Sequence, residues 1–178
     1  RQIQSLIRLI EDMLDVSRIR TGKLSIRPAP VDLAQVVAQL LESFAAQISA
    51  AQSSVNFTAG QPVVGQWDEF RIEQVISNLL TNALRYGAKK PVDVAVYIKG
   101  DEAVVDVRDQ GIGISAENQQ RIFQQFERVS ASHVTAGLGL GLFISEQIVA
   151  AHSGTIQVQS TLGEGALFRV CLPLVQKT

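Results

Sequence analysis

The sequence predicts an α+β fold, a two-layer sandwich in which helices cover one face of a mostly antiparallel sheet. Long segments with the apolar periodicity of helices occur at 32–51 and 68–87, and a shorter one occurs at 138–151. Alternating apolar residues predict strands that follow each other as hairpins, at 92–107 and 155–174. Because these strands are neighbours in sequence and do not alternate with helices, an antiparallel sheet is favoured over a parallel one.

Residues 1–22 predict an additional N-terminal helix with an apolar seam. Its apolar residues recur at spacings of three and four, as in packed helix pairs: Ile3, Leu6, Ile7, Ile10, Met13 and Leu14. Gly22 and Pro28 end the segment. We interpret it as the end of a dimerisation helix, and an ordinary amphipathic helix of the same domain is the alternative. Since the pattern is already in progress at Arg1, we expect the chain to be part of a longer protein.

The helix predicted at 32–51 opens with Asp32, a residue type that caps helix N-termini. The apolar stripe that predicts its buried face consists of Leu33, Val36, Val37, Leu40, Leu41 and Phe44. A strand-like segment at 54–59 follows, and then a turn. This order places a helix before the first strand of the predicted sheet.

The helix predicted at 68–87 carries the candidate chemistry. It ends at Gly87, a usual residue at helix C-termini, and its core stripe consists of Ile72, Val75, Ile76, Leu79 and Ala83. At about 100° per residue, Asn78, Asn82 and Arg85 fall together on an adjacent stripe. Amide oxygens beside a fixed positive charge suit a hydrated Mg²⁺ ion and phosphate oxygens. Paired asparagines are also common as solvated helix residues, so this pattern alone leaves both interpretations open.

The motif RDQGIGI places Asp109 at the end of an alternating strand, with Gly111 and Gly113 directly after it. Two spaced glycines let the backbone pass close to a flat ligand while the carboxylate faces a cavity. Asp109 is therefore a candidate acceptor for an exocyclic amine such as that of adenine. A tight turn capped by an aspartate is the alternative.

The motif TAGLGLGLFI places Gly137, Gly139 and Gly141 at the start of a helix predicted to begin near Leu138. Glycines at a helix N-terminus let backbone N–H groups approach an anion, and the helix dipole adds to the attraction. A flexible loop is the alternative. The spacing is not GxGxxG, and no GxxxxGK[ST] motif occurs, so the sequence excludes a Rossmann fold and a P-loop.

Together, and in this order, these motifs resemble the sensor histidine kinases of two-component systems, within the ATPase superfamily that includes gyrase and MutL. The resemblance covers nearly all of the chain. LDVSRIRTGKL resembles the end of the dimerisation helix, NLLTNALRYG the asparagine box, DQGIGI the first glycine box, IFQQFERVS the phenylalanine box, and GLGLGLFI the second glycine box. It implies a Bergerat-type ATP-binding fold, with the dimerisation segment at 1–22 and the catalytic ATP-binding domain at 23–178.

The resemblance also implies a role for each matching residue. Asn82 is expected to be the main Mg²⁺ ligand, with Asn78 supporting it, and Arg85 to contact phosphate. Tyr86 is expected to lie beside adenine, and Asp109 to bind the adenine amine. The other implied nucleotide-binding residues are Gly111, Gly113, Phe123, Phe126, Gly137, Leu138, Gly139, Leu140 and Gly141.

A mobile lid is implied at about residues 124–136, anchored by Phe123 and Phe126; plain core packing is the alternative role of these two aromatic residues. The segment is short and has few charges, and Arg128 is its candidate contact to the γ-phosphate. This short lid is one departure from the family. Another is the Gly-Ala pair at 87–88, where the family commonly has Thr-Pro. This change removes no implied ligand.

The implied reaction is transfer of the γ-phosphoryl group of Mg-ATP to a histidine nitrogen, mainly by positioning and charge neutralisation. An ATP-hydrolysing gyrase-like or MutL-like module is the first rival, but such enzymes carry a Glu where Asn78 stands, and an amide is no general base. The related serine kinases of anti-sigma antagonists lack the dimerisation-helix ending. A degenerate module without nucleotide binding is disfavoured by the intact Asn82 and Asp109.

Neither histidine of the chain matches the family's phosphoacceptor, a helical His followed directly by an acidic residue. Val134 follows His133, and Ser153 follows His152, which we expect to cap or pack a helix end. The acceptor is therefore expected upstream of Arg1. The implied partners are ATP or ADP, the upstream dimerisation helices with this histidine, a response regulator, and a second copy of the protein in a homodimer.

Composition excludes several other functions. The formal net charge of -1 provides no basic surface for nucleic acid or an anionic membrane. No apolar run approaches the roughly 20 residues of a membrane-spanning helix, and no signal peptide opens the chain. Cys171, the single cysteine, is expected to be a core residue in a reducing compartment. We therefore expect a cytoplasmic domain without membrane contact of its own, and membrane anchoring of the longer protein stays open.

Overall fold

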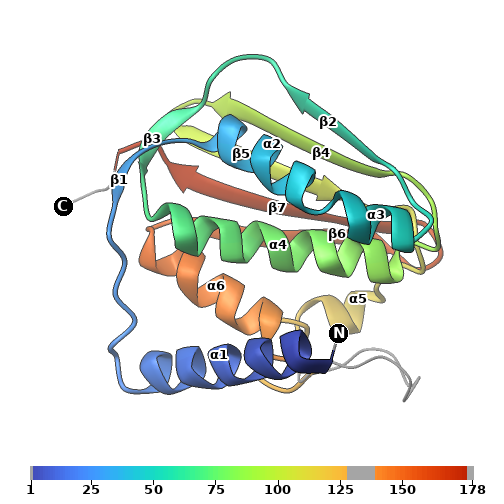
Figure 1. Cartoon of the computed structure of the whole chain (residues 1–178), viewed down its shortest axis with the longest axis horizontal. Coiled ribbons are helices and arrows are strands. Elements are labelled where there is room, and N and C mark those ends of the chain that lie inside the picture. The colour runs from blue at the N-terminus through green and yellow to red at the C-terminus, as the bar shows by residue number, and fades with distance from the viewer. Residues whose placement is uncertain (1, 128–138, 176–178) are drawn as a thin grey trace.

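The computed structural model describes residues 2–127 and 139–175 (Figure 1). The helices in this part of the chain are α1 (Gln2–Arg20), α2 (Leu33–Ser43), α3 (Ala45–Ala50), α4 (Glu69–Tyr86), α5 (Ala116–Gln119) and α6 (Gly141–Ala151). The strands are β1 (Ala29–Asp32), β2 (Val55–Ala59), β3 (Val64–Trp67), β4 (Val92–Lys99), β5 (Glu102–Arg108), β6 (Thr155–Thr161) and β7 (Gly165–Pro173). The predicted helices and hairpins are thus present, and the short strands β1 and β3 and the helix α5 are additions to the prediction.

The main sheet has five strands in the order β2-β4-β5-β7-β6. β4, β5, β7 and β6 pair antiparallel, as predicted, whereas β2 pairs with β4 in parallel, because α4 lies between the two strands in sequence and crosses over the sheet. β1 and β3 form a separate antiparallel pair. Helices α2, α4 and α6 cover one face of the main sheet (Figure 1), which confirms the predicted two-layer sandwich.

The core lies between these helices and the sheet. The predicted stripe of α4 is buried in full: Ile72, Val75, Ile76, Leu79 and Ala83. It packs in one apolar cluster with sheet residues that include Val94, Val105, Val107, Phe168 and Val170. The polar stripe of α4 lies beside this buried stripe, so the core fixes the direction in which the polar side chains point.

The helix predicted at 32–51 is interrupted, which corrects the prediction of one continuous helix. Phe44 separates α2 from α3 with backbone angles φ -86° and ψ -2°. The hydroxyl of Ser43 donates to the Leu40 carbonyl at 2.7 Å, a side-chain bond that competes with the helical backbone pattern. The N-cap is confirmed, because the Asp32 carboxylate accepts from the Ala34 N–H at 3.0 Å.

Trp67 anchors the segment that leads into α4. Its side chain is fully buried, and its Nε1–H donates to the Pro173 carbonyl at 2.9 Å. The indole ring lies directly on Gly65, where a Cβ atom would come within 2.3 Å of the ring. The next residue, Asp68, caps α4 by accepting from the Arg71 N–H at 3.2 Å. The start of α4 is therefore fixed by both packing and capping.

His152 joins the end of α6 to the start of α4. It is 0% exposed, and its Nε2 accepts from the Asp68 N–H at 3.0 Å. An acceptor at Nε2 requires the proton at Nδ1, which donates to the Ile148 carbonyl at 2.8 Å. Burial lowers the pKa of His152, so the ring is held neutral. The packing role predicted for His152 is confirmed.

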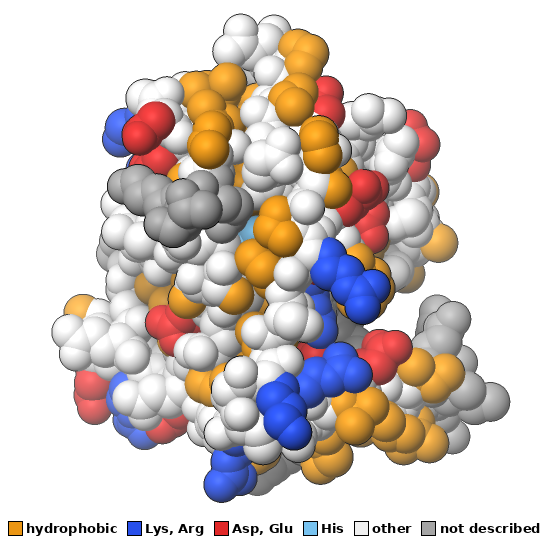
Figure 2. Space-filling view, turned by 90° about the vertical axis from the view of Figure 1, so that its left-hand side faces the viewer, with side chains coloured by type: hydrophobic (Ala, Val, Ile, Leu, Met, Phe, Trp, Pro, Cys, Tyr) orange, Lys and Arg blue, Asp and Glu red, His pale blue; other side chains and the backbone are white. Residues whose placement is uncertain are grey.

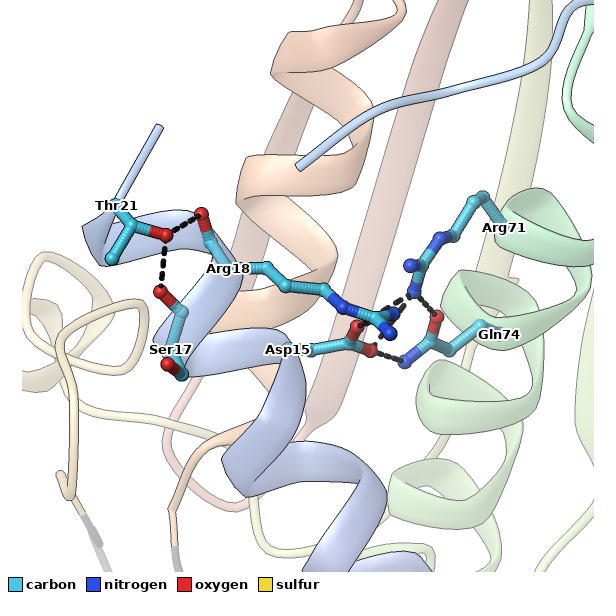
Figure 3. A network of polar contacts seen from close by, with 6 residues as sticks. All are labelled: Asp15, Ser17, Arg18, Thr21, Arg71 and Gln74. Carbon is cyan, nitrogen blue, oxygen red and sulfur yellow. Dashed lines mark hydrogen bonds and ion pairs between the residues drawn. The ribbon is translucent and has the colours of Figure 1, made fainter. Parts of the chain in front are cut away.

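A buried polar network joins α1 to α4, and Figure 3 shows Asp15, Arg71 and Gln74 pointing toward one another. Asp15 is 4% exposed, and its two oxygens accept from Nη1 of Arg71 at 3.0 and 2.9 Å. Gln74 donates to Asp15 at 2.8 Å and accepts from Arg71 at 2.8 Å. Arg18 lies farther away, at 3.7 Å from Asp15. Each of the three central side chains therefore contacts the other two.

Where the side chains are described, the apolar seam of α1 is exposed. α1 lies against α6 (Figure 1), and Val16 and Ile19 are partly buried there. The seam residues of known placement are each at least half exposed: Leu6, Ile7, Ile10, Met13 and Leu14. Hydrophobic side chains gather accordingly at the lower right of Figure 2, at the height where α1 lies in Figure 1. A contiguous exposed apolar patch of this kind marks an interaction surface.

Candidate functional site

The polar stripe of α4 forms the centre of the candidate site. Asn78 is 8% exposed, Asn82 is half-buried and Arg85 is exposed, so the stripe runs from the interior to the surface along the helix. Within residues 2–127 and 139–175, neither Asn82 nor Arg85 makes a side-chain hydrogen bond or ion pair. The amide oxygen of Asn82 and the guanidinium of Arg85 are therefore available to a ligand.

Asn78 contacts the first two turns of α6. Its Nδ2 donates to the hydroxyl of Ser145 at 3.1 Å. Gly141 lies so close that a Cβ atom there would come within 2.3 Å of the Asn78 Oδ1. The structure thus brings the first asparagine of the stripe together with one of the predicted glycines. Ser145 was missed by the sequence analysis, although its spacing of four residues from Gly141 places both on one face of a helix.

The loop after β5 crosses the end of α4. The Ile112 N–H donates to the Tyr86 carbonyl at 3.3 Å. A Cβ atom on Gly111 would come within 1.8 Å of the same carbonyl oxygen and 2.8 Å of the Gly87 Cα. Only glycine fits where two backbones approach this closely. The loop and the half-buried Tyr86 are therefore neighbours, as the implied adenine site requires.

Gly87 ends α4 as predicted but not in the left-handed conformation usual for a terminal glycine. Its φ is -73°, and the next two residues, Ala88 and Lys89, take φ values of 54° and 63°. The physical reason for a glycine here is local crowding, because a Cβ atom on Gly87 would come within 2.4 Å of the Ala83 carbonyl oxygen, while Gly111 packs against the Gly87 Cα. The Gly-Ala pair therefore shapes the contact between the helix end and the loop.

Asp109 is buried at the end of β5. Its Oδ1 accepts from the Gly111 N–H at 2.8 Å, and its own N–H donates to the Ala166 carbonyl at 2.9 Å. Burial raises the pKa of Asp109 above its usual value, and backbone hydrogen bonds from Gly111 and Ala166 to the carboxyl group partly offset this. No side chain among the described residues bonds the carboxylate. The carboxylate therefore keeps acceptor capacity for a ligand amine.

The β6–β7 hairpin and α5 hold the loop in place. The Ile114 N–H donates to the hydroxyl of Ser160 at 2.8 Å, and Gln119 donates to the carbonyls of both residues at 2.9 and 2.8 Å. Gly113, at φ +68°, lies against the Thr161 carbonyl. Sequence reasoning missed Ser160 and Gln119, because their partners are about 40 residues apart. The loop is thus a rigid wall of the candidate site.

The two predicted phenylalanines differ in environment. Phe123 packs edge-on against Phe168, with ring centroids 6.5 Å apart. Phe126 is 61% exposed at φ +63°, so core packing is the wrong interpretation for this residue. Its N–H donates to the Gly139 carbonyl at 3.1 Å, which joins the start of the predicted lid to the segment that follows it.

Several predictions for the lid fall outside the described residues. These are most of the lid itself and the residues Arg128, His133, Gly137 and Leu138. The helix predicted to begin near Leu138 begins at Gly141 in the structure. The reason is local, because Gly139 adopts φ +69° and Leu140, which is buried, forms the N-cap at φ -102°.

The donor set fits a cation shared with a ligand. No group of three or more His, Cys, Asp or Glu side chains that could hold a metal ion occurs among the described residues. The oxygens present are the amide oxygens of Asn78 and Asn82. Mg²⁺ needs few protein oxygens when phosphate oxygens and water complete its coordination shell. Two amide oxygens are therefore enough for Mg²⁺, but too few for a metal ion whose ligands all come from the protein.

Comparison with known proteins matches the chain to one family. Residues 67–176 match the family described as histidine kinase-, DNA gyrase B-, and HSP90-like ATPase. The circadian input-output histidine kinase CikA of Synechococcus elongatus is 34% identical over 96% of this chain and 23% of its own length. The chain therefore spans about a quarter of that relative.

Two solved structures share the fold over nearly the whole chain. The histidine kinase AdeS of Acinetobacter baumannii is 25% identical with a TM-score of 0.80, over 97% of this chain and 80% of that chain. Full-length ShkA in complex with AMPPNP is 27% identical with a TM-score of 0.84, over 97% of this chain and 36% of that chain.

Among the residues that the structure describes, no helix is long and apolar enough to cross a membrane.

Proposed function

Because the chain belongs to the histidine kinase-, DNA gyrase B-, and HSP90-like ATPases, as an ATP-binding domain of the sensor histidine kinase type, we propose that it binds Mg-ATP for phosphoryl transfer to a histidine. The histidine belongs to a preceding segment of the longer protein. The observation that carries the proposal is that two elements, α6 and the loop after β5, meet α4 on either side of its open polar residues. Asn78 meets the start of α6, Asn82 and Arg85 stay open, and the Asp109 loop crosses the helix end.

The proposed nucleotide lies along α4 with its base at Tyr86 and its phosphates toward Asn78. Asp109 accepts from the adenine amine through its carboxylate, which no described side chain bonds. This acceptor discriminates against guanine, which carries an oxygen at that position. Gly111 and Gly113 hold the wall of the base pocket close to the helix end. The proposed phosphate cover is the glycine segment from Gly137 to Gly141.

The proposed metal ligands are the amide oxygens of Asn82 and, in support, Asn78. When bound, Mg²⁺ neutralises charge on the β- and γ-phosphate oxygens. Arg85 adds a fixed positive charge one helical turn away from Asn82. These residues orient the triphosphate and reduce its charge repulsion toward an incoming nucleophile.

Transfer to a protein side chain is favoured over hydrolysis. An amide does not accept a proton as a general base at neutral pH, and Asn78 is already engaged with Ser145. His152 is also unsuitable as a phosphoacceptor, because it is 0% exposed and both ring nitrogens are hydrogen-bonded. The domain therefore acts as the phosphoryl donor, and the acceptor lies elsewhere.

The proposed division of the chain follows the exposed seam of α1. Residues 1–22 are the end of the dimerisation segment, whose apolar face packs against the preceding helix and a second copy in a homodimer. Residues 23–178 are the catalytic domain. The longer protein then passes the phosphoryl group to a response regulator, as a phosphoprotein intermediate in the cytoplasm, where ATP is available.

Two measurements test the proposal. Titration with ATP and Mg²⁺ is expected to show saturable binding, and failure to bind would contradict the proposed function. Incubation of the chain with γ-labelled ATP is expected to leave it unlabelled, whereas addition of the preceding helix produces an acid-labile, base-stable phosphate. Acid-labile label on His133 or His152 of this chain would contradict the assignment of the acceptor. Rapid release of inorganic phosphate would favour an ATPase.

A further inference from the structure

The carboxamide of Asn78 lies in a slot made by one face of α6. Gly141 and Ser145 are four residues apart and line this slot on the same side of the helix. The Ser145 hydroxyl receives the Asn78 Nδ2–H at 3.1 Å, and the Gly141 Cα lies against Oδ1. One α6 residue thus contacts each end of the amide.

The contact with Ser145 holds one end of the Asn78 amide. A carboxamide has a donor end and an acceptor end of nearly the same shape, so its hydrogen bonds, rather than its packing, define its orientation. In the structure the Ser145 hydroxyl accepts from Nδ2, and Oδ1 lies toward the glycine side of the slot. Ser145 is 2% exposed and Asn78 is 8% exposed, so water does not compete well for this hydrogen bond.

We propose that Ser145 is a positioning residue that holds the Asn78 carboxamide with its oxygen toward the phosphate end of the site. The proposal deepens the function proposed above and rests on it. Ser145 itself is too deeply buried to contact the nucleotide. It acts through Asn78, and Gly141 contributes by leaving space for the amide oxygen, since any Cβ there would displace it.

The first test needs no nucleotide. In the wild-type chain, the two Nδ2 protons of Asn78 are expected to give separate NMR signals that exchange slowly with water, assigned by their loss in Asn78→Asp. Ser145→Ala removes only the hydroxyl and is expected to accelerate this exchange about tenfold or more, because the donor loses its buried partner. Ser43→Ala removes a hydroxyl that bonds the Leu40 carbonyl on α2, and is the matched control. Unchanged exchange in Ser145→Ala would overturn the proposal.

The second test measures the affinity for ATP with Mg²⁺ and with EDTA. Ser145→Ala is expected to reduce the gain in affinity due to Mg²⁺ by about fivefold to tenfold, and to leave the affinity in EDTA unchanged; tuning of this order is typical of residues that orient a ligand side chain. Equal losses under both conditions, or no loss, would overturn the positioning role. If the wild-type chain binds no ATP, the proposed function fails, and the amide exchange still decides whether Ser145 orders Asn78.

Discussion

The two halves of α4 use polar side chains in opposite ways. In the first half, Arg71 and Gln74 are fully engaged with each other and with Asp15 of α1. In the second half, Asn82 and Arg85 make no side-chain hydrogen bond or ion pair with any described residue. Both sets lie on the same amphipathic helix, so the residue types alone do not separate them. The difference shows that saturation by partners within the chain distinguishes a structural polar cluster from a candidate ligand site.

Asn78 stands between these two cases. Its Nδ2 is satisfied within the chain by Ser145, as in the first half of the helix. Its Oδ1 lies against Gly141 and has no hydrogen-bond partner among the described residues, like the polar groups of the second half. One polar atom of Asn78 is therefore hydrogen-bonded within the chain and the other is not. The substitutions below test the bonded residues before Asn78 and the unbonded residues after it.

The largest expected effect is on stability, from breaking the closed cluster. Asp15→Ala leaves the Arg71 guanidinium buried without its ion pair, and removal of one partner of a buried pair costs about 3–5 kcal/mol of unfolding free energy. Urea denaturation measures this loss. Glu11→Ala, on an exposed position of the same helix, is the control and is expected to change stability by less than about 0.5 kcal/mol. A loss below about 1 kcal/mol for Asp15→Ala would show that the cluster is open to water.

Replacing both Asp15 and Arg71 tests whether the unpaired charge causes this loss of stability. Asp15→Leu combined with Arg71→Met removes both charges, and apolar replacement of a buried ion pair is often neutral or stabilising. The double variant is therefore expected to recover most of the stability that Asp15→Ala loses. A double variant as unstable as Asp15→Ala would indicate that the shape of the charged cluster, not its electrostatics, joins α1 to α4.

The next effect is on binding, from the open half of the helix. Asn82→Ala is expected to reduce affinity for ATP in Mg²⁺ by on the order of tenfold to a hundredfold, with unchanged affinity in EDTA, because an oxygen ligand of the metal is lost. Its stability is expected to stay within about 0.5 kcal/mol of the wild type, since no internal partner is lost. Gln74→Ala is the matched control on α4, with the opposite pattern of lowered stability and unchanged binding. Mg²⁺-dependent affinity that survives in Asn82→Ala would contradict the metal assignment.

Asp109→Asn separates binding from stability in the base pocket. We expect a loss of about tenfold in affinity for ATP and a smaller loss for GTP, because a charged acceptor for the adenine amine is replaced by a neutral amide. Burial raises the pKa of Asp109, which means that ionisation of this carboxyl group is less favourable in the folded chain than in the unfolded chain. The substitution is therefore expected to leave the melting temperature unchanged or raised. Equal losses for both nucleotides would remove Asp109 from the adenine pocket.

The smallest expected effect is a pH dependence from His152. Its pKa in the folded chain lies below the ordinary histidine value of 6.5, so the unfolded chain binds the proton more readily. The contribution of neutral His152 to stability is fully present above pH 6.5 and decreases as the pH falls from 6.5 through the folded-state pKa. The decrease is at most about 1.4 kcal/mol per pH unit. Urea denaturation between pH 7.5 and about 5 is expected to show this slope in the wild type and not in His152→Gln.

The sequence predicted the helices and strands whose apolar residues follow a regular period. α4 was predicted from Asp68 to Gly87 and runs over Glu69–Tyr86, because the capping aspartate, the apolar period and the terminal glycine all occur in this one segment of sequence. Both hairpins followed from alternating residues. The parallel pairing of β2 with β4 and the four-residue strands β1 and β3 were missed, because short segments carry little periodicity and their pairing depends on distant residues.

The sequence predicted the residues of the candidate site but not the residues that hold them in place. Motifs close in sequence identified Asn78 and Asp109, and the structure places each beside the glycines of a distant motif. Ser145 was missed because a single hydroxyl in an apolar helix gives no pattern. Asp15 and Arg71 were missed because their pairing spans 56 residues of sequence. The metal and nucleotide contacts themselves stay predictions.

The burial of Trp67 gives the chain an optical reporter of its own. Trp67 is the only tryptophan in the sequence, and its indole lies in the core against Gly65, with its N–H bonded to Pro173. An indole that moves from an apolar core into water shifts its fluorescence to longer wavelengths, so emission reports unfolding without a label. Thirteen residues of helix, or roughly 20 Å, separate Glu69, near this ring, from Asn82. ATP is therefore expected to leave the emission wavelength unchanged, and one fluorescence titration in urea can record stability separately from nucleotide binding.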